Sequence, residues 1–258
     1  MNLDLEGRHV LITGGSKGIG LACAKGFLAE GAKVAITSRS DANLSRALSS
    51  LGQVLTVAAD LVDATAALGM IDRVELELGA IDILVTSAGA ARRTAPEDLT
   101  PAAWRAAMDA KYFPYINVID PMVKRMAARG RGVIVNIVGN GGKLASPTHL
   151  PGGAANAALM LATVGLAHAY AARGVRILAI NPGLTRTTRV TEGLQAEAKL
   201  HGISEAEAFE RSVDRIPLGR LAEPEEIAAM TVFAASPCAS YLTGVVVAMD
   251  GASSPIVV

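Results

Sequence analysis

Short apolar runs alternate with longer amphipathic segments along most of the 258-residue chain. Runs of strand length lie at residues 9–13, 33–38, 54–60, 81–87, 132–138, 175–182 and 244–251, with helical patterns between them, the longest at 101–128 and 152–172. Parallel strands need long connections, which are usually helices, so this alternation indicates helices on both faces of a parallel sheet. We therefore predict an α/β fold: a Rossmann-like, doubly wound parallel sheet in three α/β/α layers.

One domain over residues 1–258 accounts for this pattern, because no Pro-rich or Ser-rich linker and no further repeat interrupts it. Residues 184–215 are the exception: this polar stretch between a predicted strand and the next helix is long for a connection. We predict that it forms a mobile helical lid.

Charge and composition exclude several classes of partner. Lys plus Arg and Asp plus Glu number 24 each, so no overall field attracts nucleic acid or an anionic membrane. The apolar runs are too short to span a bilayer and the first residues lack a signal-peptide pattern, which favours a cytoplasmic location. Cys23, Cys238 and the four histidines lack metal-ligand spacing, so we expect no metal.

A glycine-rich turn, "ITGGSKGIG", follows the first predicted strand and opens the first helix. A helix N-terminus there offers unpaired N–H groups and a partial positive charge to a pyrophosphate. The spacing G-x-x-x-G-x-G differs from the common G-x-G-x-x-G fingerprint, and turn sterics alone is the alternative explanation. The predicted dinucleotide contacts in this turn are Gly14, Ser16, Lys17, Gly18, Ile19 and Gly20.

The end of the second predicted strand indicates which dinucleotide binds. Sites that favour NAD usually carry an acidic residue there for the ribose 2′-hydroxyl, whereas this chain reads "AITSRS", with Arg39 and no acid. Arg39 and Lys17 could clamp a 2′-phosphate through charge-assisted hydrogen bonds. We predict NADP(H) as the cofactor; the alternative is that both residues are solvated surface cations.

The motifs, in this order, resemble the short-chain dehydrogenase/reductase family, in particular its 3-oxoacyl-carrier-protein reductase-like members, over about residues 5–251. The resemblance includes "TGGSKGIG", Asp60 in "AADLVD", "TSAGA" at 86–90, "GVIVNI", "NPGLTRT" at 181–187 and the ending "PLGRLAEPEEIAAMTVFAASPCASYLTGVVVAMDGA". It implies an NADP(H)-dependent oxidoreductase that interconverts a small-molecule carbonyl and an alcohol, with residues 184–215 over the substrate.

The resemblance also implies further contacts. Asp60, followed by Leu61, would contact the adenine, and Ala88 and Gly89 would pack on the cofactor. The nicotinamide side would be lined by Pro182, Gly183 and Thr187. The assembly implied is a homotetramer or dimer, with the 101–128 and 152–172 helices at the contacts.

The chain departs from the family where the chemistry should lie. Family enzymes use a Ser, a Tyr thirteen residues later, a Lys four beyond the Tyr, and an Asn from the preceding long helix. Matching the motifs puts these positions on Gly139, Gly152, Asn156 and Lys111, so the resemblance implies a divergent member without the Ser/Tyr/Lys group. Glycines at 139, 141, 142, 152 and 153 predict a wider pocket at this point.

A substitute for the missing groups is available in "KYFPY". Lys111 and Tyr115 are four residues apart and share a helix face, and Pro114 should kink that helix. A desolvated lysine can titrate low enough to act as an acid or base. Our hypothesis is that Lys111, assisted by Tyr115 or His149 and with Asn156 nearby, provides the catalytic group.

Three alternatives stay open at this stage. Lys111 could be a structural residue that pairs with Asp109 or Asp120. The chain could be a catalytically silent, nucleotide-binding subunit that joins an active relative in a mixed oligomer. It could also use Lys111 as a base for a non-redox lyase or isomerase reaction, since one fold hosts many chemistries.

Overall fold

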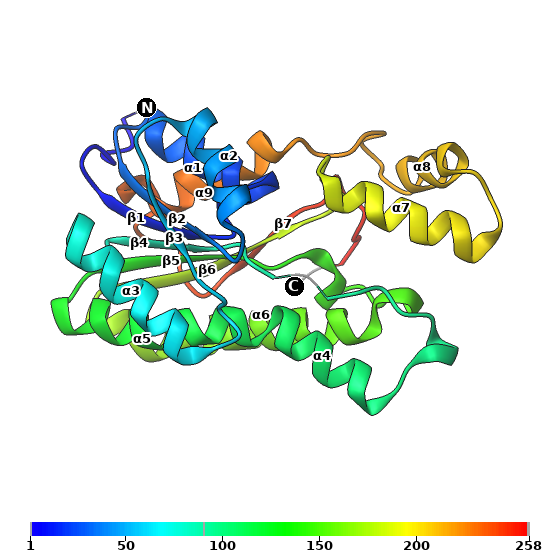
Figure 1. Cartoon of the computed structure of the whole chain (residues 1–258), viewed down its shortest axis with the longest axis horizontal. Coiled ribbons are helices and arrows are strands. Elements are labelled where there is room, and N and C mark those ends of the chain that lie inside the picture. Colours follow the sequence, from blue (N-terminus) through cyan, green and yellow to red (C-terminus); the bar gives the residue numbers. More distant parts are fainter. Residues whose placement is uncertain (1, 90, 257–258) are drawn as a thin grey trace.

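The computed structural model describes residues 2–89 and 91–256, which form a seven-stranded parallel sheet between two layers of helices (Figure 1). The strands are β1 (His9–Thr13), β2 (Lys33–Ser38), β3 (Leu55–Ala58), β4 (Ile83–Thr86), β5 (Gly132–Ile137), β6 (Val175–Pro182) and β7 (Val246–Met249). Their order across the sheet is β3-β2-β1-β4-β5-β6-β7, and every pair is parallel. The predicted fold class is confirmed.

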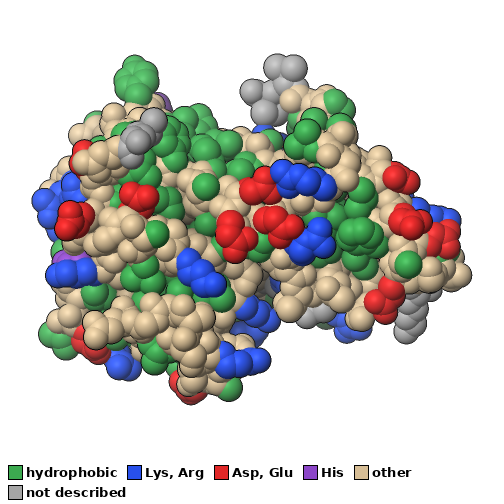
Figure 2. Space-filling model, turned by 90° about the horizontal axis from the view of Figure 1, so that it is seen from above, with side chains coloured by type: hydrophobic (Ala, Val, Ile, Leu, Met, Phe, Trp, Pro, Cys, Tyr) green, Lys and Arg blue, Asp and Glu red, His purple; other side chains and the backbone are tan. Residues whose placement is uncertain are grey.

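Helices cover both faces of the sheet. They are α1 (Gly18–Ala29), α2 (Asp41–Leu51), α3 (Ala64–Leu78), α4 (Pro101–Lys111), α5 (Phe113–Arg129), α6 (Leu150–Tyr170), α7 (Thr188–His201), α8 (Glu205–Asp214) and α9 (Pro224–Ala235). The layer with α1, α2 and α9 packs on one face, and the layer with α3, α5 and α6 packs on the other. Figure 2 views the first layer from outside, where acidic and basic side chains are interspersed.

The strands are apolar on both faces because both faces are covered. In β1, Leu11 belongs to the core under α3, α5 and α6, whereas its neighbours Val10 and Ile12 belong to the core under α1, α2 and α9. Successive side chains of a strand point to opposite faces, so a sheet covered twice requires continuous apolar runs rather than alternation. This explains the uninterrupted runs in the sequence.

The chain order reverses between β1 and β4, which are neighbours in the sheet. Crevices that bind ligands open at such reversal points, outside the carboxyl ends of the strands. The turns after β1 and β4 touch there: a Cβ atom on Gly14 would lie 2.9 Å from backbone atoms of Ala88. The predicted cofactor turn therefore lies at the centre of this edge.

The predicted 101–128 helix is two helices in the structure. α4 ends at Lys111 and α5 begins at Phe113, with Pro114 in its first turn, where a missing N–H is tolerated. The residue between them, Tyr112, keeps right-handed helical angles (φ −80°, ψ −57°). Lys111 and Tyr115 therefore still lie on one face and meet, although the boundary falls between them.

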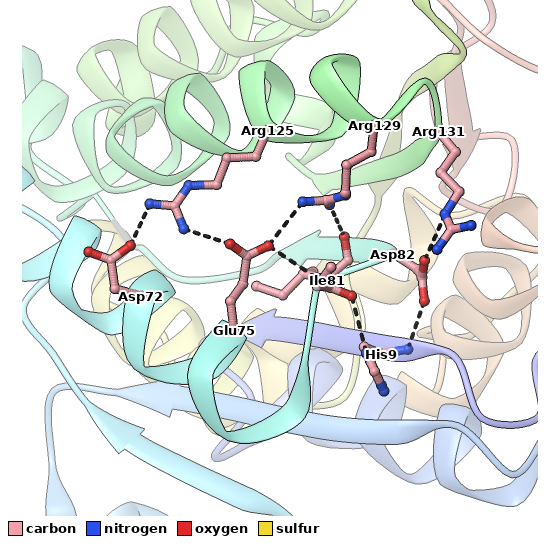
Figure 3. A network of polar contacts seen from close by, with 9 residues as sticks. His9, Asp72, Glu75, Ile81, Asp82, Arg125, Arg129 and Arg131 are labelled. Carbon is pink, nitrogen blue, oxygen red and sulfur yellow. Dashed lines mark hydrogen bonds and ion pairs between the residues drawn. The ribbon is translucent and has the colours of Figure 1, made fainter.

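Ion pairs fix α5 against α3 and the start of β4 (Figure 3). Arg125 contacts Asp72 at 2.5 Å and Glu75 at 2.6 Å, and Arg129 contacts Glu75 at 3.2 Å and donates to the carbonyl oxygen of Ile81 at 2.7 Å. Glu75 is the centre of this network, and its side chain is only 18% exposed. The network holds the helix whose first turn carries Tyr115.

The segment Pro147–Arg173, which contains α6, is long and apolar enough to cross a membrane by length and composition alone. Half of its apolar window is buried within this fold, where α6 packs against β6 and the turn at Asn140–Gly142. Its apolar character is explained by this packing in the core.

Candidate functional site

A cavity of about 1190 Å³ opens at the carboxyl ends of the strands. Its size exceeds that of a typical small-ligand pocket, so it has room for a dinucleotide and a second molecule. Most of the predicted site residues line it: Gly14, Ser16, Lys17, Gly18, Ile19, Arg39, Asp60, Leu61, Ala88, Gly89, Lys111, His149, Asn156, Pro182, Gly183 and Thr187.

Two predicted site residues lie outside the lining. A Cβ atom on Gly20 would lie 2.4 Å from the carbonyl oxygen of Gly14, so this glycine lets α1 close on the turn rather than contacting a ligand. Tyr115 is 1% exposed and lies beneath the lining. Because it lies in the core, Tyr115 can assist at the site only through its hydrogen bond with Lys111, and this assistance stays a prediction.

The β1–α1 end of the cavity fits a phosphorylated dinucleotide. No side chain caps α1, whose N-cap residue is Lys17, and its first turn has no acidic residue, so its first N–H groups are left for an outside partner. Gly14 and Gly18 have positive φ (+67° and +57°), a conformation that glycine adopts without strain. Lys17 and Arg39 are exposed cations in the lining, where a 2′-phosphate would find them.

Four buried polar atoms of lining residues lack a hydrogen-bond partner among the described residues: Thr37 Oγ1, Asn140 Oδ1, His149 Nδ1 and Asn156 Oδ1. Buried polar atoms are almost always paired in folded proteins. Unpaired atoms in a cavity wall are expected where a ligand supplies the partner. The residues present therefore fit NADP(H).

The predicted lid segment is helical, as α7 and α8, which pack against each other. α7 lines the cavity with Arg189, Gly193 and Glu197, among others, and the end of α8 lines it with Ser212. These helices lie beyond the ends of the strands (Figure 1). Their movement over a substrate stays a prediction.

Lys111 is a lysine buried in the cavity wall, with 8% of its surface exposed. Its Nζ donates to the Tyr115 hydroxyl at 2.8 Å and to the carbonyl oxygen of Ile137 at 3.4 Å, and it lies 4.4 Å from the centre of the Tyr115 ring. Burial, together with the positive charge of Arg189, lowers the pKa of Lys111 to about 7. Both protonation states are therefore accessible near neutrality.

The structural ion pair considered for Lys111 is wrong. Asp120 pairs instead with Lys124, at 2.7 Å on the exposed side of α5. Within the described residues, Lys111 has only oxygen atoms of a tyrosine and a peptide as partners. No carboxylate among the described side chains compensates its charge, which is unusual for a buried lysine.

The space expected to be open at Gly152 is filled by the imidazole of His149. A Cβ atom on Gly152 would lie 2.2 Å from His149 Cε1 and 2.6 Å from Nε2. On the other side of the ring, a Cβ atom on Gly141 would lie 3.1 Å from Cδ2. The two glycines leave room for one histidine, so the prediction of a wider pocket at this point is wrong.

Two neighbouring glycines serve close backbone packing. A Cβ atom on Gly153 would lie 2.6 Å from the carbonyl oxygen of Gly141, and one on Gly142 would lie 2.7 Å from the backbone nitrogen of Ala157. The turn Asn140–Gly142 thus lies directly on α6. Gly139 has φ +124°, and its Cβ atom would lie 3.3 Å from Asn156 Nδ2.

The turn that carries His149 is held by the loop after β4. The Thr94 N–H donates to the carbonyl oxygen of Thr148 at 3.0 Å, and Arg93 donates to the Thr148 hydroxyl at 3.2 Å. Arg93 also reaches α7, since a Cβ atom on Gly193 would lie 3.5 Å from its Nε. Sequence reasoning missed Arg93, because it belongs to no motif and only the fold brings residue 93 beside residue 148.

The imidazole of His149 lies in a positive environment. Burial first, and then the positive charges of Arg93, Arg189 and Lys111, together lower its pKa to about 4. His149 Nδ1 is buried without a hydrogen-bond partner among the described residues. The ring is therefore neutral at physiological pH. In residues 2–89 and 91–256, no group of three His, Cys, Asp or Glu side chains could hold a metal ion.

Fold and cavity together define a dinucleotide-binding protein of the doubly wound α/β class. A family model described as enoyl-(acyl carrier protein) reductase matches residues 14–253. The chain belongs to the short-chain dehydrogenase/reductase family.

Similar proteins cover nearly the whole chain. Galactitol 2-dehydrogenase (L-tagatose-forming) of Cereibacter sphaeroides is 35% identical over 96% of this chain and 95% of its own length. The 3-oxoacyl-acyl-carrier-protein reductase FabG of Thermotoga maritima is 32% identical over 96% and 98%. The crystal structure of L-sorbose reductase from Gluconobacter frateurii, complexed with NADPH and L-sorbose, matches with a TM-score of 0.92 and 28% identity over 100% of both chains.

Proposed function

We propose that the protein is an NADP(H)-dependent oxidoreductase that interconverts a carbonyl and an alcohol, and that Lys111 exchanges the proton in an atypical active site. The observation that carries this proposal is a lysine in the cavity wall, buried without a carboxylate partner among the described residues, whose pKa lies at about 7. A general acid or base works best when its pKa is near the operating pH.

The roles of the residues follow from their contacts. NADP(H) supplies or accepts the hydride when bound. In reduction, the Lys111 ammonium donates a proton to the substrate oxygen and is left as a neutral amine; in oxidation the amine takes the proton from the alcohol. Tyr115 holds the Lys111 amine from beneath, because its own hydroxyl donates to the carbonyl oxygen of Ile137. Burial raises the pKa of Tyr115, so the phenol stays neutral.

Several features support NADP(H) over NAD(H). Lys17 and Arg39 line the cavity, and the described part of the lining places no acidic side chain beside them at the end of β2. The similar L-sorbose reductase was crystallised with NADPH. The Asn156 amide, in the middle of the wall and with an unpaired Oδ1, is placed to bond a bound cofactor or substrate.

Calorimetric titration of the purified protein with NADPH and with NADH tests the cofactor. We expect micromolar binding of NADPH with clear preference over NADH. Arg39→Ala should weaken NADPH binding about 10–100-fold, since a charge-assisted hydrogen bond contributes about 1.5–3 kcal/mol, and should leave NADH binding within about twofold.

Arg46 on the exposed side of α2 provides the matched control, because it lies outside the cavity lining. Arg46→Ala should bind both cofactors as the wild type does. Equal binding of NADPH and NADH by the wild type would contradict the assignment to Arg39 and Lys17. No binding of either cofactor would favour a silent subunit of a mixed oligomer.

A homotetramer or dimer is the assembly we propose. Large apolar side chains are exposed on adjoining helices, namely Trp104 on α4, Phe113 on α5, and Leu161 and Val164 on α6, with Leu161 75% exposed. Monomers seldom leave such groups facing water together. Sedimentation velocity should show a dimer or a tetramer. Leu161→Glu should shift the distribution toward smaller species. A wild-type protein that stays monomeric at all micromolar concentrations would contradict the proposed assembly.

A further inference from the structure

We propose that His149 is a second catalytic residue, whose imidazole, seated in the side-chain space of Gly152, donates a hydrogen bond to the reacting oxygen of the substrate. This inference rests on the proposed oxidoreductase function. The family's tyrosine matches Gly152 in this chain, and the inference gives a role to the His149 imidazole that occupies the side-chain space at that position.

The geometry at Gly152 is the first step. All three of the nearest atoms to a Cβ atom built there belong to the His149 ring, at 2.2, 2.6 and 2.8 Å, which is closer than any real side chain tolerates. Any residue other than glycine at position 152 would displace the ring. Histidine at position 149 therefore depends on glycine at position 152. The imidazole of the turn residue provides a polar group at a place where the helix residue has no side chain.

The ring is also held in the cavity wall. It is enclosed between Gly141 and Gly152: its Nε2 would lie 2.6 Å from a Cβ atom on Gly152 and 3.7 Å from one on Gly141. The backbone N–H of His149 donates to the carbonyl oxygen of Ser146 at 2.8 Å, and Arg93 donates to the hydroxyl of the adjoining Thr148. A hydrogen-bond donor fixed before the reaction needs no reorganisation during it.

The charges around the ring decide which role it can play. Burial keeps the ring neutral, and the positive charges of Arg93 from the loop after β4, Arg189 from α7 and Lys111 from α4 act in the same direction. Glu197 of α7 lines the same cavity but contacts His201 and Arg215. A neutral imidazole gives no proton readily, but its N–H can stabilise a developing oxyanion.

The reaction then balances with both residues. In reduction, bound NADPH would supply a hydride to the carbonyl carbon and the π-electron pair of the C=O bond would move onto the oxygen, to which the His149 N–H donates a hydrogen bond. Lys111 delivers the proton. The products are the alcohol, the oxidised cofactor and a neutral lysine amine, and His149 ends as it began.

The test measures NADPH oxidation with L-tagatose, L-sorbose and acetoacetyl-CoA as carbonyl probes. His149→Ala should lower kcat about 10²–10³-fold, as loss of one preorganised donor does, with the Kd for NADPH within about threefold. His149→Gln, which keeps an N–H donor, should recover part of the loss. Gly152→Ala should resemble His149→Ala, because its methyl group displaces the ring while the backbone of α6 stays in place.

Matched controls come from the same helix. A Cβ atom on Gly165 meets nothing within 4 Å, and His168 is exposed, so Gly165→Ala and His168→Ala should behave as the wild type. A kcat within about threefold of wild type in His149→Ala would overturn the role of His149 and leave the proposed function intact. Absence of NADPH binding and of turnover with all three probes in the wild type would overturn both.

A second test measures the protonation state of the His149 imidazole directly and needs no turnover. The ¹⁵N resonances of His149 should stay those of a neutral ring from pH 5 to pH 8, because its pKa is lowered to about 4. A His149 ring that becomes cationic between pH 6 and pH 7 would overturn the neutral-donor role.

Discussion

Replacing Lys111 by methionine should lower the turnover of a carbonyl substrate by about 10²–10⁴-fold, the usual contribution of a positioned general acid. Methionine is unbranched and only one atom shorter than lysine, so it fills most of the same buried space beside Tyr115, but it has no proton to give. NADPH binding should be within about threefold of wild type, because the phosphate-binding turn lies at the β1–α1 end of the cavity. Steady-state kinetics and calorimetry on the same preparation measure both quantities.

The pH dependence of the wild type should follow the same group. Reduction needs the ammonium form, so kcat/KM for a carbonyl should fall about tenfold per pH unit above the Lys111 pKa of about 7. Oxidation needs the neutral amine, so kcat/KM for an alcohol should rise with pH and level off above about 7. Lys124→Met, on the exposed side of α5, is the control and should keep both profiles. Unchanged turnover in Lys111→Met would refute the assignment of Lys111.

The same substitution should make the protein more stable. The unfolded chain keeps Lys111 at its ordinary pKa of 10.5, whereas burial lowers the folded pKa to about 7. Below about pH 7 the lysine is charged in both states, and the folded state bears the full cost of a buried charge. Lys111→Met should therefore raise the free energy of unfolding by about 2–5 kcal/mol at pH 6.

The sign of this effect fixes how it changes with pH. Between about pH 7 and pH 10.5 the unfolded state binds more protons than the folded state, so the stability of the wild type rises with pH. The difference between wild type and Lys111→Met should shrink over this range and disappear above it. Urea unfolding at pH 6, 8 and 10 measures the difference. A Lys111→Met protein less stable than wild type at pH 6 would show that the ammonium is compensated in the fold.

Periodicity was sufficient to predict the sheet, its helical layers and the position of the cavity. The apolar runs of β1 to β7 are continuous because both faces of the sheet are covered. The turn at Gly14 is recognisable because a strand–helix junction with positive φ requires glycine. Lys111 and Tyr115 were predicted to meet, and they do, because four-residue spacing survives the break at Tyr112.

The contents of the space at Gly152 could not be predicted from the sequence. Glycine removes a side chain, but whether another group fills the space depends on the path of the chain outside the helix. His149 enters from the preceding turn, and Arg93 reaches it from a loop more than fifty residues earlier. Such contacts leave no periodic pattern. Burial of Tyr115 beneath the lining was missed for a related reason, since two residues on one helix face can still differ in depth.

The seating of His149 over Gly152 restricts how this chain can change over generations. A tyrosine at position 152 would need the space that the imidazole occupies, so one substitution alone would disrupt the existing arrangement before it could provide a new hydroxyl. A tyrosine at position 152 therefore requires a second change at position 149. The two positions are coupled, and a substitution at one is expected to be accommodated only together with a substitution at the other.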